Sequence, residues 1–581
     1  MEPSQVDNPP APSDVRFADG GARDLLADHL DEIMRPDSAG WDVVKENASR
    51  TVYRGRVGNE EIYLKHFRSR TALHRLGRAL GRYDALTEWY FLEHLSDRGV
   101  PTPAPLAACA ENGTEWLATR AVAPSEPADE WHRRQLKRGP AGLAAIRRAT
   151  RQLGELVGRM HAAGVIHEDL HCGNVLVRTD QDKATMVLMD LHRARHGRCL
   201  SRRSRAMNLA QLFHDRYNFT TRTDRLRFLR AYLRASGGPG TLRGWQLLVE
   251  YFASRHTARQ HRQRDRRIVG ENRYFARLSL GGGWWGHAVL ASKRQMAGSR
   301  AARHTFTREQ WEAILADPDA LFEGDDVEVI KDTRSGLLVK RTLRIGDLDV
   351  PVFIKRPRRK RAWKVLADVF RPSRPIRAFR LGHKLLTRRI ATALPLAAIE
   401  KRRGGLLLDS ILITEAVDGG ALDKFLSTYL GGRGGTTMQP RQQRQLAQDV
   451  LWQLGRLMQK LHDNNFTHRD LKATNILVHW DHHGLPELVL IDLDGLKHMW
   501  RVPARRRWQG MMRLNVSLLN CPSVTHHGRL RMLLGYLRRP GIGPINFKPY
   551  WRVLEQWSAR KLNKQIRSRR KRQKAARRPS G

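Results

Sequence analysis

The sequence predicts an α+β protein in which one domain, a small β-rich N-lobe followed by a helical C-lobe, occurs twice in tandem. Two segments, IHEDLHCGNVLV at 166–177 and THRDLKATNILV at 467–478, share an Asp-Leu-x-x-x-Asn pattern. Four residues recur at one constant offset: His161, His167, Asp169 and Asn174 return as His462, His468, Asp470 and Asn475. Strand-like and then helical runs precede both segments in the same order, which is typical of a duplicated two-lobed domain.

The elements of the first copy follow from hydrophobic periodicity and turn residues. In order, they are a helix over 22–34, strands within 42–57 and over 60–67, a helix over 84–99, a strand over 116–122 and a helix over 144–164. The helix over 84–99 is expected to end at a Gly-Val-Pro-Thr-Pro cluster, because glycine and proline stop helices.

The second copy repeats this order. Its predicted elements are paired strands over 336–346 and 348–356, a helix over 374–390, a strand over 407–417 and a helix over 444–464. Gly-Asp joins the two paired strands, which is typical of a tight hairpin turn.

Domain boundaries are expected where the composition changes. Residues 1–20 are rich in proline and are predicted to form a disordered leader. The first domain is expected over 21–304, including a basic connector, rich in glycine and arginine, from about residue 255. The second domain is expected over 305–558, followed by a basic tail over 559–581.

The charge of the chain is strongly positive, with 104 Lys and Arg against 58 Asp and Glu and a formal net charge of +46. This excess predicts attraction to polyanions: nucleic acid, anionic phospholipid or a phosphorylated glycolipid. The basic tail is interpreted either as a solvated segment or as a docking element for an anionic membrane. Trp284 and Trp285 would suit a membrane interface. No zinc-finger, helix-turn-helix or aromatic RNA-binding motif occurs, so sequence-specific nucleic-acid binding is not expected.

The four cysteines form no metal-like spacing and are expected to be reduced thiols of a cytosolic chain. No signal peptide and no apolar run long enough for a transmembrane helix is visible. We therefore expect a cytoplasmic protein whose contact with a membrane would be peripheral.

Both copies supply, in the same order, the residue types that phosphoryl transfer demands. These are a lysine on a strand, a carboxylate near the acceptor, and an asparagine and a second aspartate that ligate metal. The candidates are Lys65, Asp169, Asn174 and Asp190 in the first copy, and Lys355, Asp470, Asn475 and Asp492 in the second. After each Asp-Leu-x-x-x-Asn loop, an apolar hairpin would return the second aspartate to the loop, as in protein-kinase-like folds.

A helix glutamate normally pairs with the strand lysine and holds it against the phosphates. Glu88 is the candidate partner of Lys65, whereas the aligned position in the second copy is Ala378. The second copy must therefore lack this ion pair or take a carboxylate from elsewhere, so the first copy is favoured as the active site. Neither copy has a clear G-x-G-x-x-G motif, and the glycine-rich loop is expected to be degenerate.

The residues around both loops resemble the lipopolysaccharide core kinases, the Kdo and heptose kinase family of bacteria. The resemblance rests on GVPTPAPLA, HEDLHCGNVLV and MDLHRAR in the first copy, and on ALPLAAIE, ITEAVDGGAL, HRDLKATNILV and IDLDGLK in the second. It covers most of the chain.

This resemblance implies two tandem protein-kinase-like domains that use ATP and Mg²⁺ to phosphorylate a sugar hydroxyl of a membrane glycolipid, such as lipopolysaccharide core. It implies that Asp169 and Asp470 are catalytic bases. It further implies phosphate contacts at Lys65 and Lys355, and metal ligands at Asn174, Asp190, Asn475 and Asp492. Glu88, as the helix partner of Lys65, and Lys472, from the likeness of its loop to that of protein kinases, complete the expected ATP-binding residues. The anionic cytosolic face of the inner membrane would be the working surface.

Two alternatives remain open at this point. The segment HRDLKATN is very similar to the catalytic loop of Ser/Thr protein kinases, with Lys472 placed to meet the transferred phosphate. However, no D-F-G or A-P-E motif follows in either copy, which disfavours a polypeptide acceptor. The other alternative is a membrane-recruited scaffold in which one or both copies are pseudokinases.

Overall fold

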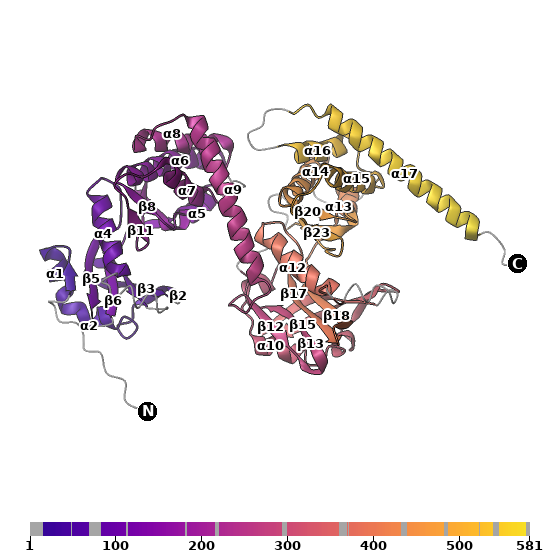
Figure 1. Cartoon of the computed structure of the whole chain (residues 1–581), viewed down its shortest axis with the longest axis horizontal. Helices are drawn as coiled ribbons and strands as arrows, with labels where there is room; N and C mark the ends of the chain where they lie inside the picture. The colour runs from indigo at the N-terminus through magenta and orange to yellow at the C-terminus, as the bar shows by residue number, and fades with distance from the viewer. Residues whose placement is uncertain are drawn as a thin grey trace. The chain divides into compact units, whose positions relative to one another are not determined.

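The computed structural model describes residues 15–47, 49–68, 83–111, 114–136, 138–180, 183–214, 220–292, 299–358, 369, 371–430, 438–480, 486–521, 523–538 and 545–576. The chain forms two compact units, Met1–Ala258 (unit 1) and Arg259–Gly581 (unit 2). Figure 1 follows the chain through both units, each with a sheet-containing lobe and a helical lobe. The predicted α+β class with two tandem domains is confirmed.

The N-lobe of unit 1 contains a six-stranded antiparallel sheet. Its strands lie in the order β1 (Val15–Phe17), β5 (Pro105–Glu111), β6 (Thr114–Arg120), β4 (Glu60–Phe67), β3 (Arg50–Val57) and β2 (Asp42–Asn47). Helices α1 (Gly20–Leu26) and α2 (Leu30–Met34) share one apolar cluster with the sheet, while α4 (Asp84–Ser96) packs against β5 and β6. Strands β3 and β4 are joined through Gly58, whose φ of 56° suits a two-residue hairpin turn.

The C-lobe of unit 1 is mainly helical. Its helices are α5 (Ala128–Leu136), α6 (Gly139–Ala162), α7 (Arg202–Phe213), α8 (Arg222–Ser236) and α9 (Leu242–Arg267). Short strands hold the signature loop: β7 (Ser125–Pro127), β8 (Val165–His167), β9 (Val175–Asp180), β10 (Lys183–Leu188) and β11 (Ala194–His196). Strands β9 and β10 form the hairpin expected after the loop.

Unit 2 repeats this plan with a larger sheet of seven antiparallel strands. Their order is β12 (Phe275–Ser279), β13 (Trp284–Val289), β17 (Pro395–Arg403), β18 (Leu406–Glu415), β16 (Leu348–Pro357), β15 (Gly336–Ile345) and β14 (Glu328–Thr333). Helices α10 (Arg308–Ile314) and α12 (Arg374–Thr387) belong to the same lobe. The Gly-Asp turn between β15 and β16 is present, with Gly346 at φ 60°.

The C-lobe of unit 2 has helices α13 (Leu422–Leu430), α14 (Pro440–Asp463), α15 (Ala504–Leu519), α16 (His526–Leu537) and α17 (Lys548–Ala576). Its strands are β19 (Gly420–Ala421), β20 (Phe466–His468), β21 (Ile476–His479), β22 (Glu487–Leu490) and β23 (Leu496–His498). The order of elements matches that of unit 1, with β21 and β22 as the hairpin after the signature loop.

The start of the chain and the division between the units differ from the sequence-based expectation. Of the expected leader, residues 1–14 lie outside the described part, but Val15–Phe17 pairs with β5. The division lies after Ala258 rather than near residue 305. Much of the expected connector belongs to unit 2, because β12 and β13 extend its sheet and Trp284 is buried in its core. Trp284 is therefore not available to a membrane.

The expected basic tail over 559–581 is helical as far as Ala576, because α17 begins well before it, at Lys548. Leu554 is buried, and Asn515 of α15 donates a hydrogen bond to Ser558 Oγ at 2.9 Å. These contacts anchor the first half of the helix to the C-lobe, and the described side chains beyond Ser558 are exposed or half-exposed. Among the described helices, none is long and apolar enough to cross a membrane.

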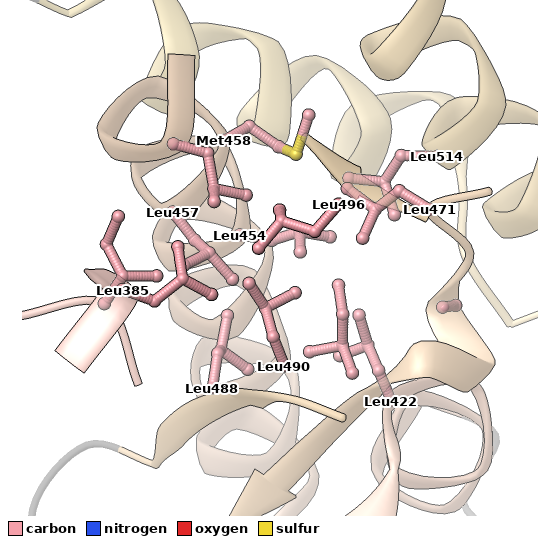
Figure 2. Packing of buried hydrophobic residues seen from close by; sticks show 14 of the residues in the cluster. Leu385, Leu422, Leu454, Leu457, Met458, Leu471, Leu488, Leu490, Leu496 and Leu514 are labelled. Carbon is pink, nitrogen blue, oxygen red and sulfur yellow. The ribbon is translucent and has the colours of Figure 1, made fainter. Parts of the chain in front are cut away.

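One hydrophobic cluster of unit 2 packs against its signature loop (Figure 2). Leu454 and Met458 of α14 pack with Leu471, which follows Asp470, and with Leu490 at the end of β22. Burial of these leucines stabilises the fold by roughly 1.5–3 kcal/mol per side chain. The same contacts hold the loop and the hairpin end at fixed positions on the face of α14.

A glycine at the same place in both copies allows two helices to pack closely. A Cβ at Gly154 of α6 would lie 2.5 Å from the Phe228 carbonyl oxygen of α8, and one at Gly455 of α14 would lie 2.0 Å from that of Met532 in α16. We expect Gly154→Ala to destabilise unit 1 by about 1–3 kcal/mol, although alanine is the better helix former. Hydrogen-exchange mass spectrometry of α6 and α8 peptides measures this change. Gly20→Ala, where nothing lies within 4 Å, is the control, and an equal effect of both variants would contradict the argument.

Candidate functional site

The signature loops of both units are fixed by a histidine. In unit 1 the Asp169 backbone N–H donates to His167 Nδ1 at 3.2 Å, and His167 Nε2 donates to the Met189 carbonyl at 3.1 Å. In unit 2 the Asp470 backbone N–H donates to His468 Nδ1 at 3.3 Å, and His468 Nε2 donates to the carbonyl of Asp492 itself at 2.5 Å. Burial lowers the pKa of both histidines, so each is a neutral ring that ties the loop to the end of the hairpin.

The asparagines of the loops are oriented in the same way. Asn174 Nδ2 donates to the Asp169 carbonyl at 3.0 Å, and Asn475 Nδ2 donates to the Asp470 carbonyl at 2.9 Å. In unit 1 the Met189 N–H also donates to the Asn174 carbonyl at 3.1 Å, so the hairpin returns to the loop as expected. With the amide nitrogen used in this way, Oδ1 is the atom left to ligate a cation.

Lys65 and Glu88 form the ion pair expected in the first copy. Lys65 Nζ lies 2.5 Å from Glu88 Oε1, and their side chains are 10% and 1% exposed. Glu88 Oε1 also accepts from the Leu191 backbone N–H at 3.2 Å. The pair therefore links β4 and α4 to the segment that carries Asp190.

Asp190 is bound by an arginine that the sequence-based prediction did not include. Arg50 Nη1 and Nη2 donate to Asp190 Oδ1 and Oδ2 at 2.6 and 2.5 Å, in a bidentate pair whose side chains are each 8% exposed. His192 Nδ1 lies 2.6 Å from Asp190 Oδ1. Arg50 is the first residue of β3.

The electrostatics of this pair favour its charged form. Burial alone would raise the pKa of Asp190, but hydrogen bonds from His192 and Arg50 and the charge of Lys65 outweigh it and hold this pKa well below its usual range. Burial would also lower the pKa of Arg50, but its bonds to Asp190 raise it above the usual value. Asp190 is thus an anion whose compensating cation is already supplied by the chain.

In unit 2 the strand lysine takes its carboxylate from another place. Ala378 of α12 is buried and occupies the position that Glu88 has in α4. Lys355 Nζ instead lies 2.5 Å from Asp494 Oδ2 and 3.6 Å from Asp492 Oδ1. The side chains of these three residues are 29–40% exposed, so this cluster is open to solvent whereas that of unit 1 is closed.

A buried carboxylate lies at the start of the lobe helix in both units, but on different strands. In unit 1 Glu115 of β6 accepts from the Ala85 N–H of α4 at 2.8 Å. In unit 2 Glu400 of β17 accepts from the Ser373 N–H, just before α12, at 2.8 Å. Because free N–H groups and the helix dipole make a helix start electropositive, each carboxylate stabilises its helix.

The two signature aspartates are the most exposed carboxylates of the sites. The Asp169 side chain is 56% exposed, with His171 Nε2 at 3.9 Å. The Asp470 side chain is 57% exposed, with Lys472 Nζ at 2.9 Å. Both carboxylates are accessible to an acceptor, and Lys472 adds a cation at this point of unit 2.

The two units differ in how well they fit Mg²⁺, which prefers carboxylate and amide oxygen ligands. In unit 2 Asp492 and Asp494 share Lys355 as their ion-pair partner among the described residues, and Asn475 offers an amide oxygen. In unit 1 atoms of Glu88, Asp190 and His192 lie within 4.8 Å of one another. The carboxylates of that group, however, are bonded to Lys65 and Arg50. The carboxylates of unit 2 are therefore open to a divalent cation, whereas those of unit 1 are engaged by cations of the chain.

Sequence reasoning missed Arg50 and Asp494, although each leaves a signal. Strand pairing aligns Arg50 with Gly336, since Val52 faces Lys65 and Leu338 faces Lys355. The difference between arginine in the first copy and glycine at the aligned position of the second is the signal that points to Arg50. Asp494 follows Asp492 by two positions, where unit 1 has His192.

His161 couples the C-lobe helices of unit 1 to the signature loop. It is fully buried, with Nε2 3.0 Å from Asn208 Oδ1 and Nδ1 2.9 Å from the Tyr232 hydroxyl. Asn208 Nδ2 in turn donates to the His167 carbonyl at 2.6 Å. Burial lowers the pKa of His161 to about 4.

This burial predicts an acid-sensitive unit 1. Because the pKa of His161 is lower in the folded state, the unfolded state binds the proton first, and stability present above pH ~6.5 is lost as the pH falls towards 4. The expected loss attributable to His161 is on the order of 3 kcal/mol. Hydrogen exchange of α6 and α8 between pH 7 and 4.5 measures it, with intrinsic exchange rates corrected for pH. His161→Gln should flatten the profile, and an unchanged profile would contradict the assignment.

Similarity to a known family extends over both copies of the fold. The model of the family "Lipopolysaccharide kinase (Kdo/WaaP) family" matches residues 39–232 and 348–536, which together make up more than half of the chain. A solved structure entitled "WaaP in complex with acyl carrier protein" is similar at 25% identity, with a TM-score of 0.33, covering 42% of this chain and 98% of that chain. The search of curated proteins gave no match. The two matched regions fall on the two copies of the fold: this chain belongs to the lipopolysaccharide kinase (Kdo/WaaP) family, carries two family domains in tandem, and is a kinase.

Proposed function

We propose that this kinase transfers the γ-phosphoryl group of ATP, with Mg²⁺, to a sugar hydroxyl of a membrane glycolipid such as lipopolysaccharide core. The observation that carries the proposal is the convergence, in a chain of this family, of a strand lysine, the loop aspartate and asparagine, and the aspartate at the end of the hairpin. Phosphoryl transfer requires positioning and charge stabilisation more than covalent chemistry, and these groups supply both.

Each candidate site residue of unit 2 that the sequence predicted has a role in this proposal. Asp470 accepts the proton of the acceptor hydroxyl, and Lys472 beside it meets the transferred phosphate. Lys355 contacts the phosphates of ATP. Asn475 and Asp492 would hold Mg²⁺, which would supply positive charge to neutralise the phosphates.

The corresponding residues of unit 1 are Asp169 as the base, with Lys65 and Glu88 as the ATP-contacting pair. Asn174 and Asp190 are the counterparts of the metal ligands. The bidentate bond from Arg50 to Asp190 distinguishes this set from that of unit 2.

A small or lipid-linked acceptor is supported by the short chain segments that follow the metal aspartates. In unit 2 only residues 499–503 separate β23 from α15, and in unit 1 only residues 197–201 separate β11 from α7. Protein kinases place an activation segment between the D-F-G and A-P-E motifs. Segments this short favour a sugar acceptor over a folded polypeptide.

The membrane part of the proposal is supported by the same segment of unit 2. Trp500 is 94% exposed, and Lys497, Arg501, Arg505 and Arg506 around it are exposed as well. An indole within a group of basic side chains suits the interface of an anionic bilayer, such as the cytosolic face of the inner membrane.

Vesicle binding tests this surface. We expect Trp500→Ala to weaken binding of the full chain to phosphatidylglycerol-containing vesicles at least tenfold, since burying apolar surface of this size contributes roughly 2 kcal/mol. Co-sedimentation measures the partition coefficient. Leu406→Ala, at another exposed apolar residue of unit 2, is the control, and equal binding of both variants would remove the support that Trp500 gives.

The proposed reaction is tested directly with γ-labelled ATP. The full chain should transfer label to a core-containing glycolipid fraction in the presence of Mg²⁺, and mass spectrometry should show one added phosphate on a sugar. Cell-envelope glycolipids from cells without the protein should lack that phosphate. Label that appears on protein instead, with none on glycolipid, would reject the acceptor class.

A further inference from the structure

We infer that the two units differ in their use of metal. Unit 2 binds nucleotide with Mg²⁺, whereas in unit 1 the Arg50 guanidinium takes the place of the metal on Asp190. The inference rests on the proposed function, since it concerns the nucleotide sites of a kinase. The presence of Glu88 in the first copy and of Ala378 in the second had favoured the first copy as the active site. This inference favours unit 2 instead.

In unit 1 the Asp190 carboxylate is bound by Arg50 at both of its oxygens. Arg50 uses both terminal nitrogens on both oxygens of Asp190, at 2.6 and 2.5 Å. A fork-to-fork pair of this kind satisfies the carboxylate in the plane where it would bind a cation. The side chains of both residues are 8% exposed, so water does not compete with the pair.

The fixed charges of unit 1 also disfavour a divalent cation. In unit 1 the buried carboxylates of Glu88 and Asp190 are balanced by Lys65 and Arg50. A divalent cation added there would meet two fixed cations in a poorly solvated place, where repulsion between like charges is weakly screened. Such a cation could bind Asp190 only after Arg50 had left.

The charge balance in unit 2 is the opposite. Lys355 is the cation close to Asp492 and Asp494, so one negative charge remains in the cluster. Asp494 also supplies the partner that Lys355 does not have on α12. The absence of a helix glutamate is thus compensated by a carboxylate beside the metal aspartate, and it does not argue against activity.

The backbone at the position of Arg50 differs between the two units. Its counterpart Gly336 has a φ of +156°, and a Cβ added there would lie 2.8 Å from the Arg356 carbonyl oxygen. A side chain is therefore excluded at this point of unit 2. In unit 1 this strand position carries the arginine that pairs with Asp190. In unit 2 the same position cannot carry one, so Asp492 has no arginine partner from this strand.

The test is equilibrium dialysis of the full chain against a labelled non-hydrolysable ATP analogue, in Mg²⁺ or in EDTA. We expect the wild-type chain to retain more analogue in Mg²⁺. The double variant Asp492→Asn/Asp494→Asn should abolish this Mg²⁺-dependent part, and Arg50→Ala should increase it by freeing Asp190. Arg54→Ala, an exposed arginine on the same strand, and Asp349→Asn, an exposed carboxylate of unit 2, should behave as wild type.

The outcomes separate the two proposals. Full Mg²⁺-dependent retention in the double variant would place the metal in unit 1 and overturn this inference, while the proposed function would stand. Equal retention in Mg²⁺ and EDTA by the wild-type chain would overturn both. The decisive variant alters only unit 2, so the result does not depend on whether Arg50→Ala folds.

Discussion

Asp470→Asn is expected to lower the rate of phosphoryl transfer to glycolipid by roughly 10²–10⁴-fold, the range that a general base contributes. Asn475 Nδ2 and His468 hold the backbone of the loop at Asp470, so the isosteric change removes the proton acceptor and leaves the loop in place. The initial rate of label transfer from ATP, measured at saturating ATP and Mg²⁺, reports the effect.

The same assay compares the two units. Asp169→Asn should reduce the rate less than Asp470→Asn, because we assign the metal-dependent reaction to unit 2. Nucleotide retention in dialysis should be preserved in Asp470→Asn, which distinguishes a chemical defect from a folding defect. A large loss with Asp169→Asn and none with Asp470→Asn would instead make unit 1 the transferring unit.

Arg50→Ala is expected to destabilise unit 1 by about 3–5 kcal/mol, since it leaves the buried Asp190 carboxylate without its cation. The effect should be seen as lost hydrogen-exchange protection in β3 and β4, the paired strands that carry Arg50 and Lys65. At lower pH the loss should diminish, because protonation of Asp190 removes the unpaired charge.

Two variants make this prediction specific. Arg54→Ala, which breaks an exposed pair with Asp42 on the same sheet, should cost no more than about 1 kcal/mol. The double variant Arg50→Met/Asp190→Leu should recover much of the lost stability, since it removes both buried charges. Equal destabilisation by Arg50→Ala and Arg54→Ala would show that the buried pair is not a significant contributor.

Much of the fold could be predicted because its signals are local. The long helices α6 and α14 have apolar faces of helical period, and the Gly-Asp turn marks the β15–β16 hairpin. The run over 42–57 is two strands, since Asn47 Oδ1 accepts from the backbone N–H groups of Ser49 and Arg50 and turns the chain without glycine. Strands β12 and β13 were missed because a composition rich in arginine and glycine hid the alternation in Phe275–Ser279.

The candidate site could be predicted only in part, because the sequence shows local signals and does not show which distant residues meet. Asp470 and Asn475 lie within one loop, and Lys65 and Glu88 stand at a spacing that a strand and the next helix allow. Arg50 and Asp190 are far apart in the sequence, and only the folded lobe shows that they meet. The partner of Lys355 likewise depended on a contact between a strand and a distant loop.

The buried carboxylates at the helix starts suggest how the copies diverged. Glu115 faces Ala110 across the β5–β6 ladder, and Glu400 faces Ser410 at the matching rung of β17–β18. The glutamate therefore stands on opposite strands in the two copies, although in both it accepts a hydrogen bond from a backbone N–H at the start of the helix. Single substitutions leading from one arrangement to the other pass through either an uncapped helix or two buried acids side by side, and both are costly. Residues of the two copies are consequently not interchangeable one at a time here, and a graft between the copies would have to carry both rungs together.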